Sequence, residues 1–189
     1  MTPDTQEKLS LITISLHWIV GLTIITLLGV GIYMANTHAY SLYPIHKSVG
    51  VCIFAVILLR VIWRIKNGWP QPAGKYKKIE QLISKIVHYV LLIGSVIIPV
   101  SGMMMSGLGG HGIHVFGLEL MARNVDPNDI SKVVPINGDL AGLGSSLHEY
   151  VSYLVIGAII LHVAGALKHH IIDKDGTLKR MLGAKISLK

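Results

Sequence analysis

The sequence predicts an all-α integral membrane protein, a four-helix bundle with both termini in the cytoplasm. Three observations lead to this prediction. The 189-residue chain is 51% hydrophobic and only 14% charged, a composition typical of membrane proteins. It contains four apolar stretches long enough to cross a bilayer, and basic residues gather beside them on one side only. The expected transmembrane helices span residues 11–34, 44–63, 79–105 and 145–168 and form a single membrane domain.

Local signals justify each of these helices in turn. The first stretch is longer than a signal-peptide core and has no strongly basic leader, so we expect a retained helix. Pro44 suits the first turn of the second helix, and Pro99 predicts a kink inside the third. Segment 64–78, which contains proline and glycine, and the Gly-rich segment 106–144 are predicted to be loops on either side of the third helix.

Charge asymmetry predicts the orientation of the bundle. Residues 60–85 contain seven basic side chains and one acid, and residues 168–189 contain six basic side chains and two acids. Segment 106–144 contains four acids and two basic residues. By the positive-inside rule, the first two segments lie in the cytoplasm and the third lies outside. The net charge of +7 therefore reflects topology, and we expect lipid and no nucleic acid as a partner.

Two histidines in the fourth helix stand out because ionisable side chains are costly inside a bilayer and usually face a bundle interior. His148 and His162 are fourteen residues apart. On an α-helix this spacing advances the chain by ~21 Å and turns it by ~1400°, about 40° short of four full turns. Both imidazoles therefore face nearly the same direction, one near each side of the membrane.

Each of these histidines has a counterpart at the same expected depth in another helix. His17 and His162 lie near the cytoplasmic ends of their helices, and His46 and His148 lie near the outer ends. A b-type haem needs two axial ligands, which imidazoles from facing helices supply. The pattern predicts two haem b groups, with irons bound by His17 and His162 on the inner side and by His46 and His148 on the outer side.

Other interpretations of the histidines stay open at this point. Each could be a buried or interfacial polar residue without a ligand. A tetrahedral zinc site needs its ligands close together, whereas these histidines form two pairs about 20 Å apart. A haem-free membrane protein that uses its histidines for metal transport is a further alternative.

The sequence also resembles the bacterial cytochrome b561 family over essentially its whole length. The motifs that carry the resemblance are Ser15–Trp18, His46–Gly50, His148-Glu149 with His162, and Ala166–His170 leading into Asp173–Met181. The resemblance implies a four-helix bundle in the bacterial cytoplasmic (inner) membrane that holds two b haems and exchanges electrons with the quinone pool. It implies the same four histidine ligands that the depth argument predicts.

Within that family, the resemblance implies electron transfer from an outer-side donor through two haems to ubiquinone. The family includes a superoxide oxidase, so superoxide is the candidate donor, and a simple electron carrier is the alternative. Another alternative is the haem-b anchor subunit of a larger respiratory oxidoreductase of the hydrogenase or formate dehydrogenase type. The electron donor is then a protein on the outer side.

Three further residues are candidates for the chemistry at the two sides. His88 and His169 lie at the inner depth, and we expect them to bind the quinone or relay its protons, because imidazole titrates near neutral pH. His88 is also the one rival haem ligand at this depth. Lys47, next to His46, either attracts an anionic donor past the acidic outer loop or binds a haem propionate. His38, His111 and His114 are expected in outer loops.

Overall fold

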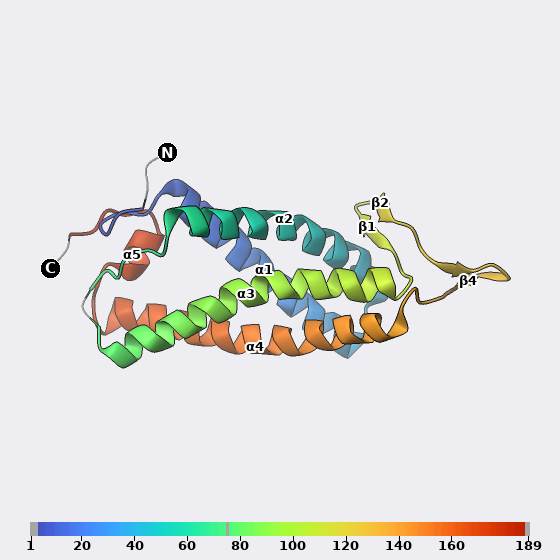
Figure 1. Ribbon diagram of the computed structural model, residues 1–189. Helices are drawn as coiled ribbons and strands as arrows, with labels where there is room; N and C mark the ends of the chain where they lie inside the picture. Colours follow the sequence, from blue (N-terminus) through green and yellow to red (C-terminus); the bar gives the residue numbers. More distant parts are fainter. Residues whose placement is uncertain (1–3, 75, 188–189) are drawn as a thin grey trace.

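The computed structural model describes residues 4–74 and 76–187, and it contains four long helices (Figure 1). They are α1 Leu11–Thr37, α2 Tyr43–Asn67, α3 Lys78–Leu108 and α4 Gly138–Ile171. All four are long and apolar enough to cross a membrane. The predicted helical membrane fold is therefore confirmed, while the cytoplasmic orientation of the termini stays a prediction.

The helices extend beyond their predicted ends. α4 differs most, since it begins at Gly138 instead of residue 145. Asn137 caps it by accepting a hydrogen bond from the Leu140 amide at 3.0 Å, a favourable helix start. The glycines in this first turn and the next conceal the helix in the sequence, because glycine has low helix propensity. α3 continues through Pro99 to Leu108.

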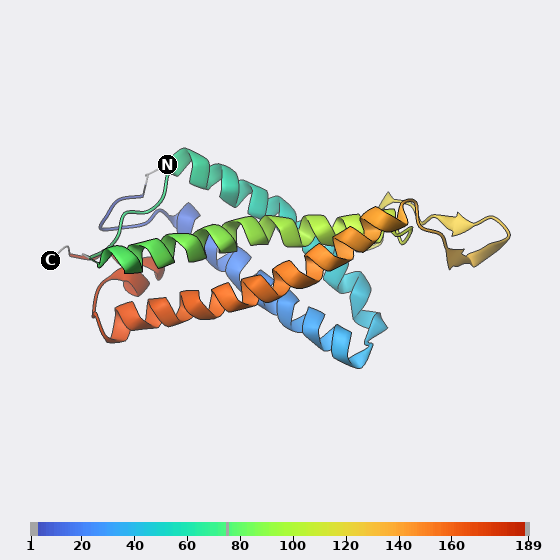
Figure 2. The ribbon, with the colours of Figure 1, turned by 60° about the horizontal axis from the view of Figure 1, so that its bottom comes forward.

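The two ends of the bundle carry different structures. The described chain ends and the short helix α5 (Thr177–Met181) lie at one end, which we call the inner end (Figures 1 and 2). The other, outer end carries two small hairpins in the segment predicted to be a loop. Their strands are β1 Ile113–Val115, β2 Leu118–Met121, β3 Val125–Asp126 and β4 Asp129–Val133. The first hairpin turns at Phe116 and Gly117, which both have positive φ.

Helices α3 and α4 pack closely along their length because glycines lie where they approach. A Cβ on Gly94 would lie 2.4 Å from Val155 Cγ2, and a Cβ on Gly144 would lie 2.8 Å from the Met105 amide nitrogen. Small residues allow such close contact between membrane helices. The α3–α4 pair therefore forms a tight unit against which α1 and α2 are arranged (Figure 2).

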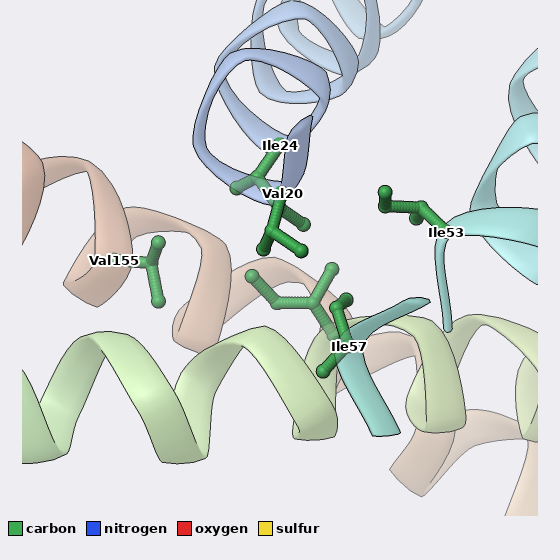
Figure 3. Close-up of a cluster of buried hydrophobic side chains, with 6 residues drawn as sticks. Val20, Ile24, Ile53, Ile57 and Val155 are labelled. Carbon is green, nitrogen blue, oxygen red and sulfur yellow. The ribbon is translucent and has the colours of Figure 1, made fainter. Parts of the chain in front are cut away.

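The apolar core lies at mid-height in the bundle, where all four helices contribute (Figure 3). Its buried residues are Val20 and Ile24 from α1, Ile53 and Ile57 from α2, Ile98 from α3 and Val155 from α4. This core separates the inner third of the bundle from the outer third.

The inner end is closed by the N-terminal segment, the α2–α3 loop and the C-terminal tail, which we call the inner cap. Arg180 is 5% exposed and donates hydrogen bonds to the carbonyls of Gln6 and Gln71. Trp18 donates to the Met181 carbonyl at 2.9 Å. These bonds connect parts of the chain that are distant in sequence, so the tail is fixed against the mouth of the bundle.

Candidate cofactor-binding site

The site is built on a regular spacing that recurs in all four helices. Positions fourteen residues apart face the bundle axis at two heights, and the residue midway between them lies in or beside the apolar core. The inner layer consists of His17, Arg60, His88 and His162, the middle layer of Ile24, Ile53, Ser95 and Val155, and the outer layer of Gly31, His46, Gly102 and His148. Seven residues turn a helix by about 700°, close to two full turns, so the three positions on each helix share one face.

Contacts between helices establish both polar layers. In the inner layer the His17 and His162 ring centres are 6.0 Å apart, and the His88 ring lies 5.1 Å from His162. In the outer layer the His46 and His148 ring centres are 6.3 Å apart. The structure thus brings together the two histidine pairs that the sequence predicts, each from a different pair of helices.

The separation within each pair suits a metal held between the rings. A metal–imidazole bond is about 2 Å long, so two imidazoles on opposite sides of one metal have ring centres roughly 6 Å apart. The His17–His162 and His46–His148 separations match this value, whereas the His88–His162 separation is shorter. The geometry therefore favours His17 over His88 as the partner of His162.

A hydrogen bond orients one candidate ligand, His148, whereas a ring nitrogen of another, His46, has no such partner in the described part of the chain. His148 Nδ1 lies 2.8 Å from the Ile98 carbonyl oxygen, so Nδ1 donates and Nε2 is free to bind a metal. His46 Nδ1 is buried and has no hydrogen-bond partner in the described part of the chain. Buried polar atoms are rarely left without a partner, and a bound group would supply the missing contact. Both observations fit an axial haem ligand.

The outer layer has room beside its histidines because glycine occupies the other two positions. A Cβ on Gly102 would lie 3.0 Å from His148 Cε1, and a Cβ on Gly31 would lie 3.6 Å from His46 Cε1. Gly21 and Gly50, one turn from His17 and His46, have open space where a Cβ would project. Such glycines allow a flat macrocycle to approach the helices.

His88 lies in the inner layer and contacts an aromatic loop residue. Its Nδ1 lies 2.6 Å from the Ser84 carbonyl and donates to it, which leaves Nε2 free. The Trp69 ring lies 6.1 Å from His88 and 5.2 Å from Tyr89. His88 is thus part of an aromatic cluster at the mouth of the bundle rather than an isolated core residue.

His169 continues the spacing of α4 by seven residues towards the inner cap. Its Nδ1 lies 2.8 Å from an Asp173 carboxylate oxygen and 3.3 Å from one of Asp175. Its ring also packs 4.5 Å from the Tyr76 ring. His169 therefore connects the inner face of α4 with acids of the cap.

The two acids beside His169 are held ionised. Hydrogen bonding from Lys168, together with its charge, outweighs the opposing effect of burial and keeps the pKa of Asp173 below its ordinary value. Burial works in the opposite direction at Asp175, but hydrogen bonds from Tyr76 and from the Thr177 amide and hydroxyl outweigh it and lower the pKa. Burial and the neighbouring Asp175 carboxylate raise the pKa of Tyr76, which stays protonated.

Lys47 lies on the outer side, where its ammonium group donates to Ser106 Oγ at 2.9 Å. It also lines a pocket of about 500 Å³, together with aromatic residues of the short 3₁₀ helix η1 (Tyr40–Leu42), of the start of α2 and of the first hairpin. Among these, Tyr40 is 71% exposed and Phe116 is 69% exposed. The outer end of the bundle therefore has a largely aromatic pocket beside the start of α2, with Lys47 in its lining.

The loop histidines lie at the outer end, as predicted. His38 ends α1 in a left-handed conformation with φ 54°, and His114 Nε2 lies 3.2 Å from Glu119. Burial, followed by the charges of Lys47 and Arg123, lowers the pKa of His111, which is neutral at neutral pH. Lys132 partly neutralises the acidic outer loop, since it pairs with Asp129 at 3.5 Å.

Sequence reasoning missed three members of the layers: Arg60, Gly31 and Gly102. From the sequence, Arg60 was interpreted only as one of the basic residues that determine the membrane orientation. The missed signal is the fourteen-residue spacing itself, because Arg60 follows His46, Gly31 follows His17 and Gly102 follows His88 at this interval. Applied to every helix instead of the fourth alone, the spacing would have revealed all three.

A four-helix membrane bundle with two layers of facing histidines is the arrangement expected of a membrane cytochrome. Residues 8–184 match the family described as prokaryotic cytochrome b561. The chain belongs to this family, and it is a membrane electron-transfer protein for which the family implies haem b. Membership argues against the haem-free metal-transport alternative.

Curated relatives agree with this assignment. The chain is 29% identical to cytochrome b561 homolog 2 of Escherichia coli K12, over 97% of this chain and 96% of the relative. It is 27% identical to the probable superoxide oxidase CybB of Yersinia pestis, over 95% of this chain and 98% of the relative. Identity to cytochrome b561 homolog 1 of Escherichia coli K12 is 23%, over 94% and 98% of the two chains.

Proposed function

We propose that this protein binds two b haems and transfers electrons from a donor on the outer side of the bacterial cytoplasmic membrane to ubiquinone on the inner side. The observation that carries the proposal is the presence of two stacked histidine pairs with ring separations of 6.0 and 6.3 Å. His17 and His162 would hold the inner iron, and His46 and His148 the outer iron. A b haem with two imidazole ligands supplies one-electron redox chemistry.

The residues around the outer pair and between the two pairs favour haem binding. The Ile98 carbonyl fixes His148 in the tautomer that presents Nε2, and Gly102 makes space for the ring. At mid-height the apolar core excludes water between the two layers. Along α4 the layers are about 21 Å apart by helix rise, which covers much of the membrane thickness.

Superoxide is the donor we favour, because a relative of similar length is named a probable superoxide oxidase. The balanced reaction oxidises two superoxide anions to two dioxygen molecules. The two electrons released and two protons convert one ubiquinone into ubiquinol. Lys47 lies one residue from His46 and lines the aromatic pocket at the outer end, where its charge would attract the anion.

The inner side suits the quinone half of this reaction, which consumes protons. His88 Nε2 lies beside Trp69, and once it is protonated it can donate a hydrogen bond to a quinone oxygen and pass on the proton. His169 contacts the ionised Asp173 and Asp175 in the cap, so it can receive protons from the cytoplasmic side. Together these residues connect the membrane interior with water.

The anchor-subunit alternative makes a different prediction for the isolated chain. We expect the purified protein to show the absorbance of two reduced b haems per chain and to form ubiquinol when supplied with superoxide. A matched reaction with superoxide dismutase present should form none. Haem without ubiquinol formation would favour an anchor that needs a catalytic partner, and a preparation that cannot bind haem would reject the proposal.

A further inference from the structure

Arg60 is the one permanently charged residue in the inner layer, and no acid in the described part of the chain neutralises it. It occupies the position of α2 that lies fourteen residues after His46, and its Nη2 lies 3.5 Å from His17 Nδ1. Guanidinium groups donate only and keep their charge in proteins. A contact of 3.5 Å with a histidine nitrogen is at the limit of a hydrogen bond. It therefore shows where the guanidinium lies but leaves most of its hydrogen-bonding capacity unused.

Every acid at the inner end of the described chain is engaged elsewhere. Asp4 pairs with Arg64, and Glu7 pairs with Lys185. Glu80 pairs with Lys168, which also contacts Asp173. Asp175 contacts His169 and accepts from Tyr76. Arg60 therefore has no carboxylate partner among residues 4–74 and 76–187.

An unpaired cation inside a membrane bundle is costly and indicates a function or a missing anion. The anion must come from something that lies between α1, α2 and α4, where the proposed inner haem would be. Haem carries two propionates, and Arg binds carboxylates by two parallel hydrogen bonds. We propose that Arg60 binds a propionate of the inner haem and positions that haem between His17 and His162. This inference rests on the proposed function.

The two sides of the membrane would then hold their haems differently. The outer layer consists of glycines and histidines only, and the nearby Lys47 is already bonded to Ser106. Arg60 would give the inner haem a fixed positive neighbour, which stabilises the reduced form because reduction adds negative charge. The inner haem would therefore have its reduction potential raised by this residue.

The test uses the full chain, purified with its haems, in the Arg60→Gln and Arg60→Lys variants. We expect Arg60→Gln to retain two bis-histidine haem spectra, while the equilibrium constant for reduction of one haem falls about tenfold, or 59 mV for one electron. Arg60→Lys should show a smaller fall. The resonance Raman propionate bending band should shift in both variants.

Arg64→Gln is the matched control. Arg64 lies one turn away, pairs with Asp4 at 3.5 Å and donates to the Gly68 carbonyl. Its loss should leave the propionate band unchanged and lower the inner potential less than Arg60→Gln does, because its charge lies farther away and is paired with Asp4. Suppose that the wild-type protein binds two haems. If Arg60→Gln then keeps the wild-type propionate band and the wild-type potentials, this inference is wrong and the proposed function stands. If Arg60→Gln cannot be purified, an unaltered band in Arg60→Lys would overturn the inference. A wild-type protein without two haems would overturn the proposed function as well.

Discussion

The inner and outer layers of the bundle have the same spacing and opposite chemistry. Both hold two facing histidines at about the same separation. The remaining two positions are Arg60 and His88 in the inner layer, and Gly31 and Gly102 in the outer layer. One layer therefore adds charge and a titratable group, while the other adds only space.

This difference teaches which chemistry each side supports. Transfer of a single electron to or from a small donor needs access and little else, and the glycines of the outer layer leave space for it. Reduction of a quinone needs protons as well as electrons, so titratable groups are useful there. Two turns beyond the inner layer on α4, His169 contacts acids of the cap. The asymmetry agrees with electron flow inwards.

The largest expected effect separates the layers by removing one ligand from each. We expect His162→Ala to lose the inner haem and keep the outer one, and His148→Ala to do the reverse. Each loss should halve the haem content per chain, because one imidazole cannot replace both axial ligands. Haem-to-protein ratios from reduced-minus-oxidised spectra measure this. Retention of both haems in either variant would contradict the pairing.

His88→Phe tests whether the extra histidine of the inner layer serves quinone or iron. We expect both haems to stay bound and ubiquinol formation to slow by about tenfold or more, since a group that transfers protons is lost. Rapid-mixing spectroscopy should show haem reduction by superoxide at the wild-type rate. Disappearance of one haem from the spectrum would instead identify His88 as a ligand.

Gly102→Val tests the space in the outer layer. Its branched side chain would press on His148 Cε1, since even a Cβ would lie at 3.0 Å. We expect outer-haem affinity to fall by about tenfold or more, in the range seen when residues that support a metal ligand are changed. Haem retention during dilution would show it. Gly142→Ala is the control, because a Cβ there meets nothing within 4 Å.

The smallest expected effect concerns the inner cap, for which the outer end has no counterpart. Asp4 accepts hydrogen bonds from the Ser10 amide and from Thr13 Oγ1, and it pairs with Arg64. Burial opposes ionisation, but these partners outweigh it and lower the pKa of Asp4 below 3.8. We expect Asp4→Asn to destabilise the protein by about 1–2 kcal/mol at neutral pH.

The pH dependence of that effect follows from the lowered pKa. A carboxyl whose pKa is lower in the folded state stabilises the protein fully above its unfolded pKa, and the contribution is lost as pH falls through the folded pKa. The difference in thermal unfolding midpoint between wild type and Asp4→Asn should therefore shrink as pH drops below 3.8. A difference that persists in acid would mean that Asp4 acts through shape rather than charge.

Much of this architecture could be predicted from local sequence, and the failures have physical causes. Length and hydropathy are properties of single segments, so all four helices were predictable. The start of α4 was missed because glycine has low helix propensity, although Asn137 caps the helix. The hairpins of the outer loop were missed because their strands are only two to five residues long and contain no fully buried residue.

Sequence alone determined the four helices, the depth of each histidine and the pairing of His17 with His162 and of His46 with His148. Those properties depend on the length of each segment and on the period of the helix, which are properties of each segment taken separately. Only the tertiary structure decided which other residues complete the layers, that Arg60 has no acid partner, and that the cap acids contact His169. These features depend on the rotation of each helix about its axis. Packing at Gly94, Gly144 and the core sets that rotation. Such packing joins residues that are far apart in the chain.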